Sequence, residues 1–147
     1  MAWVFVVDQD RRPLNPMHPG EARRLLTPRN AAVWRRSPFT IILTRAVPNA
    51  LVALLRVKID PGSSRTGLAL VNDTAGQVVW AAELAHRGDQ VKDRRARRRR
   101  RTRYRPARFA NRRRREGWLP SSLESRIQNV LTWVVRLRRF SPIGAIS

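Results

Sequence analysis

The residues best suited to chemistry in this 147-residue chain are the arginines between positions 87 and 115. Fifteen arginines and Lys92 stand against Asp89 and Asp93 there, a net formal charge of +14 out of +21 for the chain. A guanidinium group grips phosphate oxygens through paired hydrogen bonds and also stacks on bases. The tract therefore predicts recognition of nucleic-acid phosphates.

Two aromatic rings, Tyr104 and Phe109, lie among these cations, where such rings stack on unpaired bases. A disordered, nonspecific basic arm is the alternative interpretation of the tract, and a nuclear localisation signal is a weaker one. Both neighbouring segments look folded, which favours an ordered interface. The candidate nucleic-acid-binding residues are Arg94, Arg95, Arg97, Arg98, Arg99, Arg100, Arg101, Arg103, Tyr104, Arg105, Arg108, Phe109, Arg112, Arg113, Arg114 and Arg115.

Other reactive side chains lack suitable partners in the sequence. The chain has no cysteine, which excludes a disulfide framework and a thiolate metal site. His18 and His86 have no second histidine at metal-binding spacing, so hydrogen bonding or RNA contact is expected of them. Carboxylates expected to be structural, solvated or turn-forming are Asp8, Asp10, Asp73 and Glu83.

Composition and hydropathy place the chain among intracellular nucleic-acid-binding proteins. It is 42% hydrophobic with a pI near 12.0. The longest apolar patch, near residues 50–55, is too short to cross a bilayer, and the first ten residues do not resemble a signal peptide. A cytoplasmic, prokaryotic protein associated with nucleic acid and not with membranes is expected.

The elements that must position the arginines begin with a small α+β module at residues 1–46. An apolar run predicts a strand at 3–7, helical spacing predicts a helix at 19–26, and two further strands are expected at 31–36 and 39–45. The tryptophans expected to be core or packing residues, and not platforms for base stacking, are Trp34, Trp80, Trp118 and Trp133.

A second unit spans residues 47–88. Strands at 54–59, 66–71 and 78–84 are separated by turn sequences and predict a three-stranded antiparallel meander. The first of these strands is expected to be buried on both faces. It delivers Asp60 at its carboxyl end, although Asp60 before Pro61 and Gly62 also suits a turn.

The tract itself occupies residues 89–116 and predicts a helix at 90–103, which should fray alone because its arginines repel one another. Residues 117–147 predict an amphipathic helix and one further strand at 143–147, at an open edge with a risk of aggregation. Ser121 and Glu124 have the spacing of a capping box. The apolar stripe of that helix is Leu123, Ile127, Val130, Leu131, Val134 and Leu137.

A meander with an acid on its first strand, followed by a helix and another strand, is typical of the start of a ribonuclease H-like domain. Enzymes of that kind hydrolyse phosphodiesters with two divalent metals held by several carboxylates. Asp60 is the candidate catalytic residue and metal ligand, and Mg²⁺ is the expected cofactor if further residues complete the site, since one carboxylate cannot hold two ions.

Several motifs, in order, resemble the IscB family of transposon-encoded, RNA-guided nucleases. Pro13-Leu14-Asn15-Pro16 is similar to that family's Pro-Leu-Met-Pro motif, with Asn15 as a departure. Arg94-Arg95-Ala96-Arg97-Arg98 matches the motif that names the associated RRXRR domain. The other matching segments are Lys58-Ile59-Asp60-Pro61-Gly62-Ser63, Thr66-Gly67, Glu83, His86-Arg87-Gly88, Arg103-Tyr104-Arg105-Pro106, Arg108-Phe109, Asn111-Arg112-Arg113 and Gly117-Trp118-Leu119-Pro120-Ser121-Ser122.

This resemblance implies a PLMP-like module followed by an incomplete RuvC-like domain that an arginine-rich bridge helix interrupts. Asp60 then matches the first catalytic acid, and residues 90–103 match the helix that lies against guide RNA and its heteroduplex with target DNA. Family members continue past the last strand into a glutamate and further nuclease elements. The chain is therefore expected to be an N-terminal portion, unless a second polypeptide completes the nuclease domain.

Two further hypotheses stay open at this point. A stand-alone RNA-binding module of ribosomal-protein type suits the size and the charge. A relic without a present role is the other.

Overall fold

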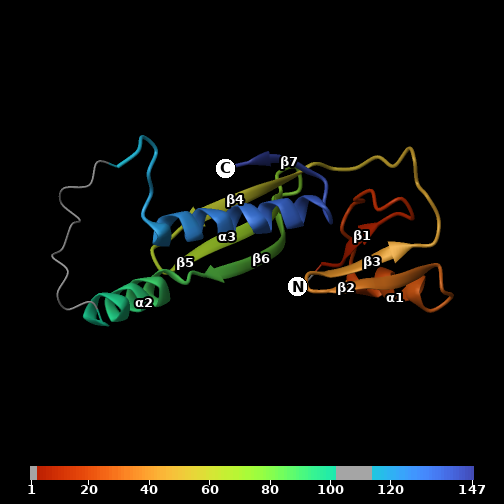
Figure 1. The fold of residues 1–147 in the computed structure, drawn as a ribbon. Helices are drawn as coiled ribbons and strands as arrows, with labels where there is room; N and C mark the ends of the chain where they lie inside the picture. Colours follow the sequence, from red (N-terminus) through yellow and green to blue (C-terminus); the bar gives the residue numbers. More distant parts are fainter. Residues whose placement is uncertain (1–2, 102–113) are drawn as a thin grey trace.

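The computed structural model describes residues 3–101 and 114–147, which form a mixed α+β fold (Figure 1). Almost every expected helix and strand is present within two or three residues of its predicted bounds. In chain order the elements are β1 (Phe5–Val7), α1 (Pro19–Leu26), β2 (Ala31–Arg36), β3 (Phe39–Leu43), β4 (Leu55–Pro61), β5 (Arg65–Asn72), β6 (Gln77–Ala85), α2 (Gly88–Arg101), α3 (Ser121–Arg138) and β7 (Ile143–Ile146).

The first sheet has the strand order β1-β3-β2, with β1 parallel and β2 antiparallel to β3. Val6, Ile41 and Ala22 are buried between this sheet and α1. α1 has its predicted bounds because Pro19 suits the first helical turn and Pro28 cannot continue the helix. His18 is its N-cap, with Nδ1 accepting a hydrogen bond from the Gly20 amide at 3.2 Å.

The second sheet has the strand order β6-β5-β4-β7. Strands β4, β5 and β6 form the predicted antiparallel meander, and β7 lies parallel to β4 at the sheet edge. After β4 the chain passes through β5, β6, α2 and α3, and β7 then pairs with β4, the first strand of this sheet (Figure 1). The end of β4 and the start of α2 therefore lie at one end of the sheet.

α3 covers one face of the second sheet. Val134 and Leu137 are buried against Val57 and Leu70, and the rings of Trp80 and Trp133 stack with centroids 6.1 Å apart. The predicted apolar stripe is divided into a buried part and an exposed part, because a helix contacts a twisted sheet along part of its length only. Three residues of that stripe are exposed: Leu123, Ile127 and Leu131.

Side chains of the first sheet also enter the core of the second sheet. Phe5 of β1 is buried among side chains of the second sheet and α3. Trp34 of β2 meets Phe140 edge to face, with ring centroids 5.4 Å apart. Trp34 and Phe140 thus join the N-terminal module to the end of α3, where the chain turns into β7. The division at residue 46 stays a prediction.

The structure corrects two expectations. β4 is buried on one face only, since Leu55 and Val57 point to α3 while Lys58 and Asp60 lie on an open face. The capping box does not form, because the helix begins at Ser121 with Pro120 as N-cap and no side-chain capping bond.

Candidate nucleic-acid interface and carboxylate site

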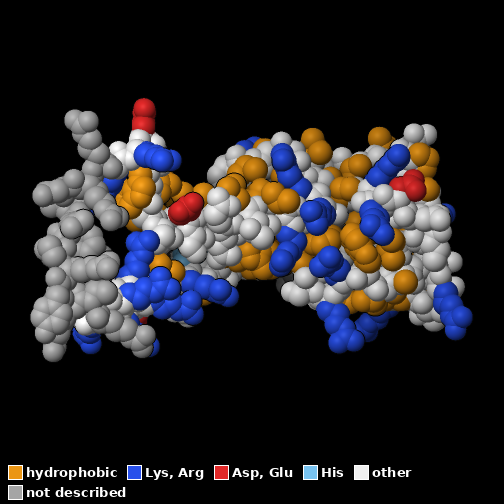
Figure 2. Space-filling view, in the orientation of Figure 1, with side chains coloured by type: hydrophobic (Ala, Val, Ile, Leu, Met, Phe, Trp, Pro, Cys, Tyr) orange, Lys and Arg blue, Asp and Glu red, His pale blue; other side chains and the backbone are white. Residues whose placement is uncertain are grey.

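α2 carries the arginine tract away from the second sheet. The helix begins at Gly88, two residues before the predicted start, with Asp89 in its first turn, where the helix dipole favours an anion. It contacts α3, and Figure 2 shows Lys and Arg side chains gathered over it at one end of the molecule. Its exposed arginines include Arg94, Arg95, Arg97, Arg98 and Arg100.

Many of the predicted contact residues lie outside the described residues, so they stay predictions. These are the side chains of Arg99 and Arg101, together with Arg103, Tyr104, Arg105, Arg108, Phe109, Arg112 and Arg113.

The tract resumes at Arg114 and Arg115, both exposed. The Arg114 guanidinium lies over the Trp118 ring, 4.1 Å from its centroid. The quadrupole of the indole ring attracts a cation over its face by roughly 0.5–1 kcal/mol in an exposed pair. Arg114 is therefore positioned just ahead of α3.

Asp60 is exposed on the open face of the second sheet. Its cross-strand partner is Gly67 of β5, which pairs in turn with Glu83 of β6. These residues line a shallow hollow of about 500 Å³, whose centre is formed by small side chains such as Ala69 and Ala81. The hollow gives Asp60 open space on the sheet side opposite α3.

A tight turn follows Asp60, built on Gly62. A Cβ atom at Gly62 would overlap the carbonyl oxygen of Arg65, so only glycine fits there. Asp60 itself belongs to β4 and not to the turn, since the strand continues to Pro61. The turn therefore sets where the strand carrying Asp60 ends.

The described residues do not assemble a magnesium site around Asp60. No group of three metal-ligating side chains occurs within residues 3–101 and 114–147. Glu83 lies two strands away, about 9–10 Å by the usual strand spacing, and pairs with Arg65 at 3.0 Å. Asp73 pairs with Arg56 at 2.5 Å. Glu83 lies on β6 and Asp73 in the turn after β5, the strand and hairpin positions expected from the sequence.

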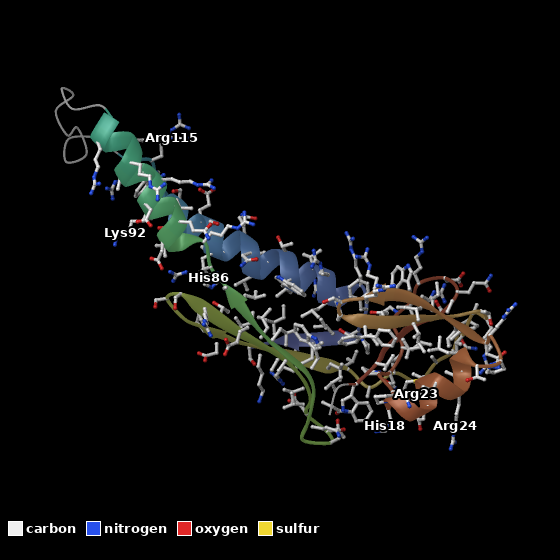
Figure 3. All side chains as sticks on the ribbon, turned by 90° about the horizontal axis from the view of Figure 1, so that it is seen from below. His18, Arg23, Arg24, His86, Lys92 and Arg115 are labelled. Carbon is white, nitrogen blue, oxygen red and sulfur yellow. The ribbon has the colours of Figure 1, made fainter. Side chains whose placement is uncertain are left out.

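A small polar cavity of about 160 Å³ lies where β6 meets α2. His86 occupies this junction, and Figure 3 shows Lys92 further along α2. The His86 Nε2 is hydrogen-bonded to Thr66 Oγ1 at 2.7 Å. Burial lowers the pKa of His86 below its ordinary value, and the charge of Arg126 lowers that pKa further. His86 is hydrogen-bonded, as expected from the sequence.

The sequence does not reveal that Lys92 and Arg126 share this cavity with His86. Arg126 is separated from Lys92 and His86 by 34 and 40 positions, and in the sequence it lies away from the apolar stripe, as a solvated arginine would. The convergence depends on how α3 crosses the sheet.

Together these features define a strongly basic α+β protein with a projecting arginine helix and a carboxylate on an open sheet face. The RRXRR protein family matches residues 4–147, and the chain belongs to this family. Membership is consistent with the resemblance to IscB and with a nuclease-associated domain. None of the curated proteins matches the chain. In residues 3–101 and 114–147, no helix has the length and apolarity needed to span a membrane.

Proposed function

We propose that this chain is the N-terminal part of an RNA-guided DNA endonuclease, and that α2 and the arginines after it bind guide RNA and its heteroduplex with target DNA. The observation that carries the proposal is the position of the family motif. Arg94-Arg95-Ala96-Arg97-Arg98 lies on a helix that stands clear of the sheet core, with all four of its arginines exposed.

The charge of α2 explains why a polyanion is its natural partner. Arginines three and four positions apart repel one another by a few tenths of a kcal/mol per pair. A phosphate backbone along the helix removes that repulsion and releases condensed counterions. RNA binding should therefore stabilise α2 as well as hold the RNA.

In this proposal Asp60 supplies the first metal-binding carboxylate of a RuvC-like site. The sheet order supports this, because β7 returns parallel to β4 in the manner of a ribonuclease H-like domain. Val57 pairs with Ile146, and Ser147 bonds to both Val57 and Ile59. A strand continuing in this register places the second residue after Ser147 opposite Asp60.

That position is where a second carboxylate would share a cation with Asp60. Two-metal sites need several carboxylates, so Mg²⁺ binding requires residues beyond those described, in the same chain or in a second polypeptide. Residues 1–147 alone are therefore expected to bind RNA without cleaving DNA. DNA cleavage in magnesium by purified protein, lost in Asp60→Ala, would overturn that expectation.

RNA binding is tested with two variants that lose the same charge. One changes Arg94, Arg95, Arg97 and Arg100 to glutamine on α2. The control changes four exposed arginines of the N-terminal module to glutamine: Arg12, Arg23, Arg24 and Arg36. The α2 variant keeps its helix, because glutamine is a good helix former and the repulsion is removed.

The expected result is a large loss of affinity for a structured noncoding RNA in the α2 variant and a small loss in the control. The slope of log affinity against log salt should fall by about 0.7 for each lost phosphate contact. Equal losses in the two variants would mean that charge alone attracts RNA, and the proposal would fail.

A stand-alone RNA-binding module is the second candidate, favoured by the lack of a completed metal site among the described residues. Competition by unrelated structured RNAs separates the two. A guide-binding protein retains one noncoding RNA selectively, whereas a general module exchanges it freely.

A further inference from the structure

We propose that the cavity between β6, α2 and α3 binds a single phosphodiester group of the RNA backbone. It lies at the start of the arginine helix, and its cationic side chains come from two helices: Lys92 from α2 and Arg126 from α3. This site rests on the proposed RNA binding for its ligand, but its geometry is independent of the family motif.

Buried polar atoms at the cavity lack partners. The Nδ1 of His86 and the Nε of Arg126 are both buried without a hydrogen-bond partner in the part of the chain that the structure describes. A buried polar group without a partner destabilises the folded protein, and more so when it is charged. Both residues line the cavity, so an anion there would supply the acceptor oxygens that they lack.

The tautomer of His86 fits an anion. Its Nε2 is held by Thr66 Oγ1, and a hydroxyl group can act there as donor. With the Thr66 hydroxyl donating, His86 carries its proton on Nδ1, which then donates to the ligand. An anion in the cavity therefore selects one of two otherwise similar hydrogen-bond arrangements.

Two helix N-termini add to the side chains. α2 begins at Gly88 and α3 at Ser121, and Ser122 of the first turn of α3 lines the cavity. Pro120 provides no side-chain cap, so the first amides of α3 lack the usual side-chain acceptor. Helix N-termini favour anions through these amides and the helix dipole.

The charges that face the cavity select a monoanion. Asp89 also lines it and opposes Lys92 and Arg126, which leaves one net positive charge while His86 is neutral. The other lining groups, from the turn after β4, are the hydroxyls of Ser63 and Ser64. A phosphodiester carries one negative charge and matches this balance, whereas the dianion of free phosphate exceeds it.

The cavity lies between the arginine helix and the turn that follows Asp60. Ser63 follows Asp60 by three residues, and Lys92 precedes the first arginine of the family motif by two. One phosphate bound here would set the register of an RNA strand along α2.

The probe for the site is dimethyl phosphate, observed by NMR of the histidine ring protons in the full chain. His86 is expected to shift saturably, with a higher pKa in the bound state, while His18 on α1 stays unchanged as the internal control. The response should be lost in Arg126→Gln and kept in Arg138→Gln, which removes an exposed charge from the same helix. Lys92→Gln provides a second variant, because Lys92 is exposed and its loss should leave the fold intact.

The site would be overturned if dimethyl phosphate did not change the chemical shifts of His86, or if it changed them equally in Arg126→Gln. Inorganic phosphate is the comparison ligand. Tighter binding of inorganic phosphate than of dimethyl phosphate at pH 7 would assign the cavity to a free anion and overturn the backbone assignment.

RNA titrations separate this inference from the proposed function. Arg126→Gln should lower the salt slope of RNA binding by about 0.7 relative to Arg138→Gln. If the chain binds no RNA while His86 still responds to dimethyl phosphate, the proposed function fails and the phosphate site stands. If RNA binds equally to Arg126→Gln and Arg138→Gln and the His86 shifts do not change with dimethyl phosphate, the phosphate site is wrong while the proposed function stands.

Discussion

Asp60 of β4 and Gly67 of β5 face one another across the open side of the second sheet, and a Cβ at Gly67 would lie 3.5 Å from the Asp60 Cβ. Glycine therefore keeps one flank of the Asp60 side chain clear. Lys58 and Glu83 line the same hollow together with small apolar side chains, and the Asp60 carboxylate is exposed to solvent. This arrangement suits a residue that binds something and contributes little to the core.

Asp60→Ala should therefore change the free energy of unfolding by no more than about 0.5 kcal/mol. Asp8→Ala is the matched control, because Asp8 is fully buried and accepts hydrogen bonds from the amides of Arg12 at 2.7 Å and Val47 at 3.4 Å. Its loss should cost about 1.5–3 kcal/mol. Urea denaturation measures both, and a comparable loss for the two variants would make Asp60 a structural residue.

The divided stripe of α3 predicts opposite results for two leucines on that helix. Leu137 is 0% exposed, and Leu137→Ala should cost about 2–5 kcal/mol through the cavity that it leaves. Leu131 is 50% exposed, and Leu131→Ala should cost about 1 kcal/mol or less. Thermal and urea unfolding would report the difference; similar costs would show that another surface covers Leu131.

The turn after Asp60 predicts a strong dependence on Gly62. In Gly62→Ala the new methyl group would overlap the Arg65 carbonyl oxygen, so the turn must distort at a cost of about 1–3 kcal/mol. Gly88→Ala is the control, because nothing lies within 4 Å of a Cβ there and the residue is helical. It should be neutral or stabilising by up to about 1 kcal/mol. Equal effects on the melting temperature would contradict this account.

His86 predicts a pH-dependent contribution to stability. Burial, aided by Arg126, lowers its pKa in the folded state, so the unfolded chain takes up a proton first as the pH falls. The folded state should therefore lose stability as the pH drops below about 6.5, the ordinary pKa of histidine. Chemical denaturation at several pH values, compared with His86→Gln, measures this. A constant difference between the two proteins above pH 5 would refute it.

The sequence alone determined the positions of the helices and strands and the location of the charge. Pro19 and Pro28 bound α1 because proline restricts where a helix starts and stops. The meander was predicted from turn sequences between runs of strand-forming residues. The location of the positive charge was evident from the number of arginines between positions 87 and 115. These features depend on residues close together in the chain, where backbone preferences and periodicity act.

The tertiary structure decided which faces are buried and which distant residues meet. Periodicity alone could not show that Leu131 is exposed while Leu137 is buried, because that depends on where α3 crosses the twisted sheet. Periodicity also could not show that Arg126 lies beside His86, since the two residues belong to elements that meet only through packing. Local sequence specifies elements, whereas a site made from several elements exists only once long-range pairing and packing have placed them together.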